Sequence, residues 1–466
     1  MRQLNTDVAI IGAGTAGMAA YKAVKKAGKT ALLIEGGPYG TTCARVGCMP
    51  SKLLIAAADA AHGISMAPAF GVDLVGEVKV DGERVMARVR NERDRFVSFV
   101  LDSIAAMPDA DKIRGHARFI ADTVLQVDDH TQIQAGGIVI ATGSSPVVPE
   151  IYRSLGRRVL INDDVFDWQT LPRSVLVVGS GVIGLEIGQA LTRLGVKVCL
   201  VNRSASLGGI SDPEVKASAR AAFQDEMDMR LDTDVHNVQL QGDDVHVVLK
   251  SRDGRMSTEV VDYVLVATGR RPNLDALSLE NTSIVLNEQG LPTINPLTLQ
   301  LGEAPVFIAG DVTGKLAVLH EANDEGYIAA GNALRYPDVV TPQRSAPLMV
   351  VFSDPQLAQV GLRFKDLPKT GVVFGQVSFV NQGRSRIILK NQGMLRLYAD
   401  SKDGRLLGAE MAGPAMEHIA HLLAWCVQQK LSVNDMLSMP FYHPVIEEGL
   451  RTALRHAAAE LATAGT

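Results

Sequence analysis

Two cysteines near the N-terminus, Cys43 and Cys48, are separated by four residues. A regular helix would place them about 7.5 Å apart along its axis, which exceeds the Cα separation of about 4.4–6.8 Å that a disulfide allows. A bridge therefore requires a bend, which Gly47 can supply, and constrained bridges tend to be reactive. Two alternatives stay open. The thiols can be unlinked core residues, or they can bind zinc, although no second Cys/His pair has matching spacing.

Two glycine-rich turns have the spacing of dinucleotide-binding sites. Each follows a short apolar run, Val8–Ile11 or Val175–Val178, that predicts a buried strand, and precedes an apolar pattern that predicts a helix. In such a turn the first glycine allows the bend, the second admits a pyrophosphate, and the third lets helix and strand pack closely. The N-terminus of the helix then faces the phosphates. The sequence thus predicts two bound dinucleotides. The glycines are Gly12, Gly14 and Gly17 in the first turn and Gly179, Gly181 and Gly184 in the second.

These turns belong to an internal repeat. Gly28 and Gly195 each follow the first glycine of their turn by 16 residues, and Glu35 and Asn202 each follow it by 23. Two further apolar runs end in the same Ala-Thr-Gly sequence, at Gly143 and Gly269. The repeat predicts two homologous α/β halves.

The two halves differ where they would bind ribose. Glu35 can accept hydrogen bonds from both hydroxyls of an unphosphorylated ribose, as in FAD or NAD. Asn202 lacks this charge, and the guanidinium of Arg203 can bind a 2′-phosphate, which favours NADP or weak discrimination. A solvated surface arginine is the alternative for Arg203.

Composition restricts the remaining function classes. A chain of 466 residues is expected to form several domains, and its net charge of −5 gives no general attraction for nucleic acid. Four cysteines are too few for a secreted disulfide scaffold, so we expect a cytoplasmic protein. We find no unbroken run of about 18 apolar residues, and therefore expect no membrane span.

Nearly the whole chain resembles the FAD-dependent pyridine nucleotide-disulfide oxidoreductases of class I, and the dihydrolipoamide dehydrogenases most. Motifs in six places carry this resemblance: the two glycine turns with Glu35 and Glu186, the cysteine segment through Lys52, and the segments Ala267–Asn273, Phe307–Asp311 and His443-Pro444.

The resemblance implies an α/β fold with two Rossmann-like dinucleotide-binding domains, for FAD and NAD(P), and a C-terminal α+β dimerisation domain. Its implied boundaries are 1–147 for the first part of the FAD domain, 148–272 for the NAD(P) domain, 273–342 for a central domain that completes the FAD site, and 343–466 for the interface domain.

Cofactor residues follow from the same resemblance. FAD would bind Gly12, Gly14, Gly17, Glu35, Thr42, Ala117, Thr142, Gly143 and Asp311. NAD or NADP would bind Gly179, Gly181, Gly184, Asn202, Arg203, Gly269 and Arg270. No metal site is expected.

The implied catalytic residues form two groups. Cys43 would exchange with the substrate, and Cys48 would be the thiol beside the flavin, where Lys52 and Glu186 would form an ion pair. His443, oriented by Glu448 and contributed by the other subunit of a homodimer, would be the base.

The implied reaction is dihydrolipoamide oxidation for a lipoyl-bearing protein of a 2-oxo acid dehydrogenase or glycine cleavage complex. Alternatives are an NADPH-dependent reductase of a free small disulfide, as in the glutathione reductases, an enzyme similar to the mercuric reductases, and a flavin-binding scaffold without turnover.

Overall fold

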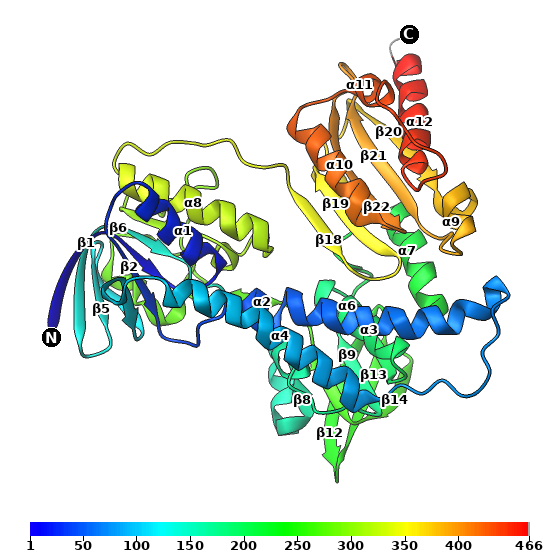
Figure 1. The fold of residues 1–466 in the computed structure, drawn as a ribbon, viewed down its shortest axis with the longest axis horizontal. Helices are drawn as coiled ribbons and strands as arrows, with labels where there is room; N and C mark the ends of the chain where they lie inside the picture. The colour runs from blue at the N-terminus through cyan, green and yellow to red at the C-terminus, as the bar shows by residue number, and fades with distance from the viewer. Residues whose placement is uncertain (465–466) are drawn as a thin grey trace. The chain divides into compact units, whose positions relative to one another are not determined.

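The computed structural model describes residues 1–464 (Figure 1). The chain forms two compact units, each assembled from three separate segments. The first unit consists of Met1–Leu53, Ala87–Val147 and Gly269–Arg344, and the second of Leu54–Met86, Val148–Thr268 and Ser345–Thr466.

A seven-stranded sheet organises the first unit, in the order β3-β2-β1-β6-β5-β4, with β17 paired to β6. Strands β3, β2, β1, β6 and β17 pair with one another in parallel, whereas β5 pairs antiparallel with β6 and with β4. The strands are β1 (Arg2–Ile11), β2 (Ala31–Glu35), β3 (Lys112–Arg114), β4 (Ala117–Ala121), β5 (Val124–Val127), β6 (Thr131–Ile140) and β17 (Val306–Ile308).

Both faces of β1 are buried at its C-terminal end. Val8 and Ile10 belong to one core cluster, with residues of α1 (Thr15–Lys26) and α8 (Leu319–Arg335), and Ala9 and Ile11 belong to a second, with residues of β4 and β5. Such alternation is the period-two pattern of a strand buried on both faces. It explains the apolar run that predicted a strand here.

The strand β1 begins earlier than its apolar run. Arg2 to Thr6 pair with Thr131 to Ala135 of β6, and most of these β1 residues are exposed or half-buried. A polar extension of a strand has no apolar run to mark it, so the sequence predicted only the buried part.

The second unit contains the second half of the repeat. Its parallel sheet has the order β11-β10-β9-β15-β8, and α6 follows β9 as α1 follows β1. A three-stranded antiparallel sheet, β12-β13-β14, packs against it. The elements are β8 (Val159–Leu160), α5 (Asn162–Val165), β9 (Ser174–Val178), α6 (Val182–Arg193), β10 (Lys197–Asn202), α7 (Pro213–Glu226), β11 (Asp228–Leu231), β12 (Thr233–Gln241), β13 (Asp244–Ser251), β14 (Met256–Val261) and β15 (Tyr263–Val266).

The C-terminal part of the second unit is an antiparallel sheet, β18-β19-β22-β21-β20, with a core shared with α10, α11 and α12. Its elements are β18 (Leu348–Val351), β19 (Gln356–Gly361), β20 (Val372–Ser378), α9 (Gly383–Ile387), β21 (Met394–Asp400), β22 (Leu406–Gly413), α10 (Met416–Gln428), α11 (Val433–Leu437) and α12 (Glu448–Ala464). The expected α/β fold with two Rossmann-like domains and a C-terminal α+β domain is confirmed.

The two cysteines lie in consecutive helices, Cys43 in α2 (Thr42–Val46) and Cys48 at the start of α3 (Cys48–Met66). The next long helix along the chain is α4 (Gly82–Ala105). One helical stretch, Thr42–Phe70, is long and apolar enough to cross a membrane by length and composition alone. The stretch contains no unbroken apolar run of about 18 residues, because Lys52, Asp59 and His62 interrupt it. By itself, such a stretch is weak support for a membrane span.

Candidate active site

The first glycine turn has the geometry of a dinucleotide cradle. Gly12 has φ +106°, and a Cβ there would lie 2.3 Å from the carbonyl oxygen of Ala141. A Cβ at Gly17 would lie 1.8 Å from the carbonyl oxygen of Gly12. Gly14 has nothing within 4 Å of its Cβ position. Two glycines are thus required by the packing of the protein, and the middle one leaves room for a ligand.

The second turn repeats this division. A Cβ at Gly179 would lie 2.3 Å from the carbonyl oxygen of Ala267, and one at Gly184 would lie 1.9 Å from that of Gly179. The Cβ position of Gly181 is open. Both turns therefore fit the pyrophosphate of a dinucleotide.

The ribose-binding positions differ in their bonding. The carboxylate of Glu35 accepts hydrogen bonds from the backbone N–H groups of Ala13 (2.8 Å) and Gly37 (2.7 Å), which fix it beside the first turn. Each oxygen retains a lone pair for a hydroxyl donor. Asn202 instead donates to the hydroxyls of Ser204 (3.2 Å) and Ser206 (2.9 Å). Arg203 beside it is exposed. At the ribose-binding position, where the first half has the carboxylate of Glu35, the second half thus has amide, hydroxyl and guanidinium groups.

Arg270 is connected by hydrogen bonds to Asp311, a residue expected at the flavin. Its guanidinium donates to the hydroxyl of Ser144 (2.9 Å), and this hydroxyl donates to the carboxylate of Asp311 (3.3 Å). We expected Arg270 at the NAD(P) site and Asp311 at the FAD site. Arg270 is therefore linked through Ser144 to Asp311, a residue assigned to FAD. The connection runs through β7 (Ser144–Pro146) and β16 (Arg270–Pro272), which pair with each other.

Sequence reasoning missed Ser144 and Asn273. The side chain of Asn273 donates to the carbonyl oxygen of Thr142 (3.0 Å), and the Thr142 hydroxyl donates to the Asn273 carbonyl oxygen (2.7 Å). The sequence did contain a signal for Ser144. It directly follows Gly143, which ends one Ala-Thr-Gly sequence, just as Arg270 directly follows Gly269, which ends the other.

Other expected FAD residues are also in the first unit. Ala117 is buried at the start of β4, and Thr42 is the exposed first residue of α2.

The structure brings the two cysteines together. The chain bends at Gly47, between α2 and α3, and Cys43 and Cys48 lie within hydrogen-bonding reach of each other. The hydrogen bond to Cys48 and burial raise the pKa of the Cys43 thiol, while the charge of Lys52 acts in the opposite direction. A Cβ at Gly47 would lie 3.1 Å from the carbonyl oxygen of Thr42, so a larger residue there would crowd the bend.

The other two cysteines are in apolar surroundings. Cys199 is buried in β10, and burial raises its pKa to about 12. Cys426 in α10 is half-buried, and burial likewise raises its pKa. Both have the environment of core thiols.

Lys52 and Glu186 belong to different units, so their pairing stays a prediction. Glu186 is buried in α6 and accepts a hydrogen bond from the backbone N–H of Phe352 (2.9 Å).

His443 and Glu448 contact each other in the second unit. The Nδ1 atom of His443 lies 3.0 Å from both carboxylate oxygens of Glu448, the first residue of α12. The backbone N–H of Val445 also donates to this carboxylate (3.3 Å). The hydrogen bond from His443 holds the pKa of Glu448 below its usual value. Because Nδ1 donates to the carboxylate, Nε2 of the exposed imidazole is left as the acceptor.

No group of three or more His, Cys, Asp or Glu residues is placed to hold a metal ion among residues 1–464.

Two family patterns match the chain. The pattern of the pyridine nucleotide-disulphide oxidoreductases matches residues 6–326, and that of their dimerisation domain matches residues 348–454. The chain belongs to this family. Members use FAD together with NAD or NADP, and the two glycine cradles of this oxidoreductase fit two such dinucleotides.

Similar proteins have more than one activity. The dihydrolipoyl dehydrogenase of Thermus scotoductus is 29% identical over 461 residues, which cover 96% of each chain. The mercuric reductase of Streptomyces lividans is 28% identical and covers 94% of this chain and 93% of its own. Among solved structures, the Cu(II) complex of the HOCl-induced flavoprotein disulfide reductase RclA from Escherichia coli has a TM-score of 0.81 at 25% identity, and covers 97% of this chain and 99% of its own.

The two kinds of glycine in the second turn give a paired prediction. Gly181→Ala should fold normally, because the Cβ has open space and φ is −75°, but its methyl group would obstruct the nicotinamide dinucleotide. Gly184→Ala should lower the melting temperature, because its Cβ would overlap the backbone of Gly179. Thermal unfolding and the KM for NAD(P) measure the two effects. Equal melting losses in the two variants would contradict this division of roles.

Proposed function

We propose that this oxidoreductase transfers electrons between a small dithiol and NAD(P), with dihydrolipoamide as the dithiol. The observation that carries the proposal is the contact between Cys43 and Cys48 at the Gly47 bend. The hydrogen-bonded pair of His443 and Glu448 supplies a base of the kind that thiol chemistry needs. Several of the similar proteins are dihydrolipoyl dehydrogenases, which supports this choice of substrate.

The thiol steps start from a Cys43–Cys48 disulfide. Nε2 of His443 removes a proton from one substrate thiol, and the resulting thiolate attacks the sulfur of Cys43. The bond between Cys43 and Cys48 breaks, and Cys48 leaves as a thiolate, which the charge of Lys52 stabilises. The second substrate thiol then attacks the substrate sulfur held by Cys43, the bond between that sulfur and Cys43 breaks, and the proton of the thiol passes to the Cys43 sulfur as it leaves. This releases the cyclic disulfide and leaves the cysteines reduced by two electrons.

Glu448 holds the imidazole so that Nε2 is the basic atom and stabilises the imidazolium that forms. FAD, when bound, supplies the two-electron chemistry that joins a dithiol to a nicotinamide. Gly12, Gly14, Gly17, Glu35 and Asp311 would hold it. We place the enzyme in the cytoplasm as a homodimer, in which His443 serves the cysteine pair of the partner subunit.

A second candidate is an NADPH-dependent reductase of another small disulfide. It is favoured by the second turn, where Asn202, Ser204 and Ser206 form a neutral hydrogen-bonded group beside Arg203. RclA, a flavoprotein disulfide reductase, is the structural relative that fits this candidate.

Initial rates distinguish the two candidates. Purified enzyme should oxidise dihydrolipoamide with NAD or NADP faster than it reduces other small disulfides with NADPH. No turnover of dihydrolipoamide with either nucleotide would exclude the first candidate. No turnover of any small disulfide would exclude the second.

Replacement of Arg203 should change the KM for NADP but not the KM for NAD. In Arg203→Ala, the KM for NADP should rise about tenfold or more, because a charge-assisted bond to the 2′-phosphate is lost, whereas the KM for NAD should change little. Arg252→Ala, an exposed arginine of the same unit, is the control. Equal changes for NAD and NADP would mean that Arg203 does not recognise the phosphate.

A further inference from the structure

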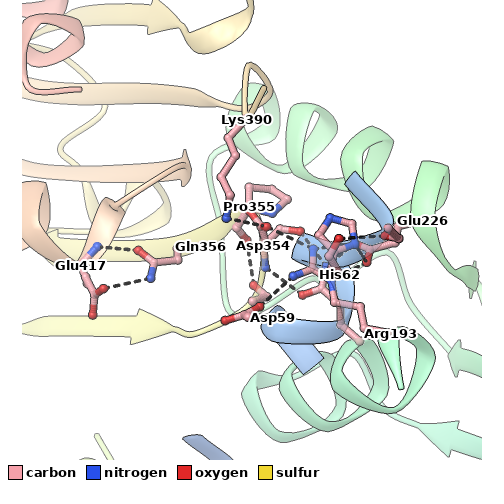
Figure 2. Close-up of polar contacts among 12 residues, drawn as sticks. Asp59, His62, Arg193, Glu226, Asp354, Pro355, Gln356, Lys390 and Glu417 are labelled. Carbon is pink, nitrogen blue, oxygen red and sulfur yellow. Dashed lines mark hydrogen bonds and ion pairs between the residues drawn. The ribbon is translucent and has the colours of Figure 1, made fainter. Parts of the chain in front are cut away.

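A buried arginine, Arg193, joins three carboxylates in the second unit (Figure 2). Its side chain is 5% exposed. Its nitrogens lie 2.5 Å from Glu226, 3.1 Å from Asp354 and 2.9 Å from Asp59. A guanidinium can satisfy several acceptors at once through its fixed fork of donors. We call Arg193 and these three carboxylates the Arg193 cluster.

Each carboxylate comes from a different part of the chain. Glu226 is the last residue of α7, Asp354 lies between β18 and β19, and Asp59 belongs to α3. Arg193 itself is the last residue of α6. The cluster therefore connects three helices and one loop.

The loop is also fastened to α6 at two other points. The backbone N–H of Asp354 donates to Gln189 (2.8 Å), and the backbone N–H of Phe352 donates to Glu186 (2.9 Å). Residues 186, 189 and 193 are spaced by three and four, so they share one face of α6. The bonds at Gln189 and Arg193 hold this face, and with it the side chain of Glu186, against the loop.

Two titratable groups, Lys390 and His62, lie beside the cluster. Lys390 lies 2.9 Å from Asp354, and His62 of α3 lies 3.8 Å from Glu226. Burial opposes ionisation of Asp354, but Lys390 and Arg193 prevail and lower its pKa. Burial lowers the pKa of His62. The carboxylate of Asp354 is thus held ionised beside Arg193.

The contact with α3 falls on a particular face of that helix. At about 100° per residue, Cys48, Lys52, Asp59 and His62 lie within about 80° of one another around the axis of α3. Asp59 is about 16 Å along the axis from Cys48. A group that fixes Asp59 and His62 therefore fixes the rotation of the helix whose first turns carry Cys48 and Lys52.

We infer that Arg193 is a positioning residue for the redox cysteines. It holds α3 at Asp59, and the first turns of this helix carry Cys48 and Lys52. The correct rotation of α3 keeps the charge of Lys52 near Cys43, where it favours the thiolate. This inference rests on the proposed role of the cysteine pair.

The test compares two reactions of the holoenzyme. Reduction of a disulfide needs the cysteines, whereas electron transfer from NAD(P)H to an artificial one-electron acceptor bypasses them. In Arg193→Met, turnover with lipoamide should fall about tenfold or more, because small misplacements of reacting groups are costly. Transfer to ferricyanide should stay within about twofold. The rate of iodoacetamide alkylation of the reduced cysteines, followed by mass spectrometry, should also fall.

Two further variants keep the test decisive. Asp59→Asn removes only the α3 contact at a half-exposed side chain, and should reproduce the selective loss in smaller degree even if Arg193→Met does not fold. Arg230→Met is the matched control, because Arg230 also binds two carboxylates of the second unit, Asp228 and Glu259, but none of α3.

Proportional losses of both reactions, or unchanged alkylation in Asp59→Asn, would make Arg193 a structural support only. If the wild-type enzyme reduced no disulfide, the proposed function would fail. Alkylation would still measure the effect of Arg193 on the thiols.

Discussion

Cys43→Ser should abolish the oxidation of dihydrolipoamide, with a loss of at least about 10³-fold in kcat. A serine hydroxyl is not ionised at neutral pH and cannot form the mixed disulfide with the substrate. Electron transfer from NAD(P)H to ferricyanide should persist, because this reaction does not need the thiol. Steady-state rates with the two acceptors, measured on protein of equal FAD content, check both expectations.

The matched control is Cys426→Ser, which removes a half-buried thiol of α10. It should leave both rates unchanged, since the pKa of Cys426 is raised by burial and its thiol is a poor nucleophile. A Cys43→Ser variant that still turned over dihydrolipoamide would exclude the proposed thiol steps and would favour a flavin-binding scaffold.

The sequence predicted the fold through local and repeated signals. Glycines that the packing requires, such as Gly17 and Gly184, leave a strict spacing, and buried strands leave apolar runs. Features that depend on a partner far along the chain gave no comparable signal. Residues 2–6 form a strand only because Thr131 to Ala135 pair beside them.

The same distinction applies to the site. The spacing of Cys43 and Cys48 was enough to single out that pair, whereas Lys52, His443 and Glu448 were assigned only from the resemblance to the family. Arg270 lies 41 residues from Asp311 and 126 from Ser144, and only the pairing of β7 with β16 joins them.

The Arg193 cluster depends most strongly on contacts between residues that are far apart in the sequence. It assembles four segments, and every member is a charged residue that would otherwise be taken for a solvated one.

His443→Gln should lower kcat for dihydrolipoamide by about 10²–10⁴-fold, the usual contribution of a positioned general base. The amide can hydrogen bond to Glu448 but cannot take a proton from the substrate thiol. The limb of the pH–rate profile that rises as this base loses its proton should disappear. Transfer from NAD(P)H to ferricyanide should remain near the wild-type rate.

Two adjacent glutamates test how the imidazole is oriented. Glu448→Gln should lower kcat less than His443→Gln does, because the base remains but its tautomer is no longer fixed by a carboxylate. Glu447→Gln is the control, since the contact with His443 Nδ1 is made by Glu448.

The direction in which the His443–Glu448 hydrogen bond depends on pH follows from the lowered pKa of Glu448. The carboxylate stays ionised as the solution is acidified below the usual pKa of a glutamate, and the pair is lost only when the pH falls through its lowered value. Orientation of His443 by Glu448 is therefore fully present at neutral pH. An equal loss in Glu447→Gln and Glu448→Gln would show that general negative charge, rather than this hydrogen bond, supports the base.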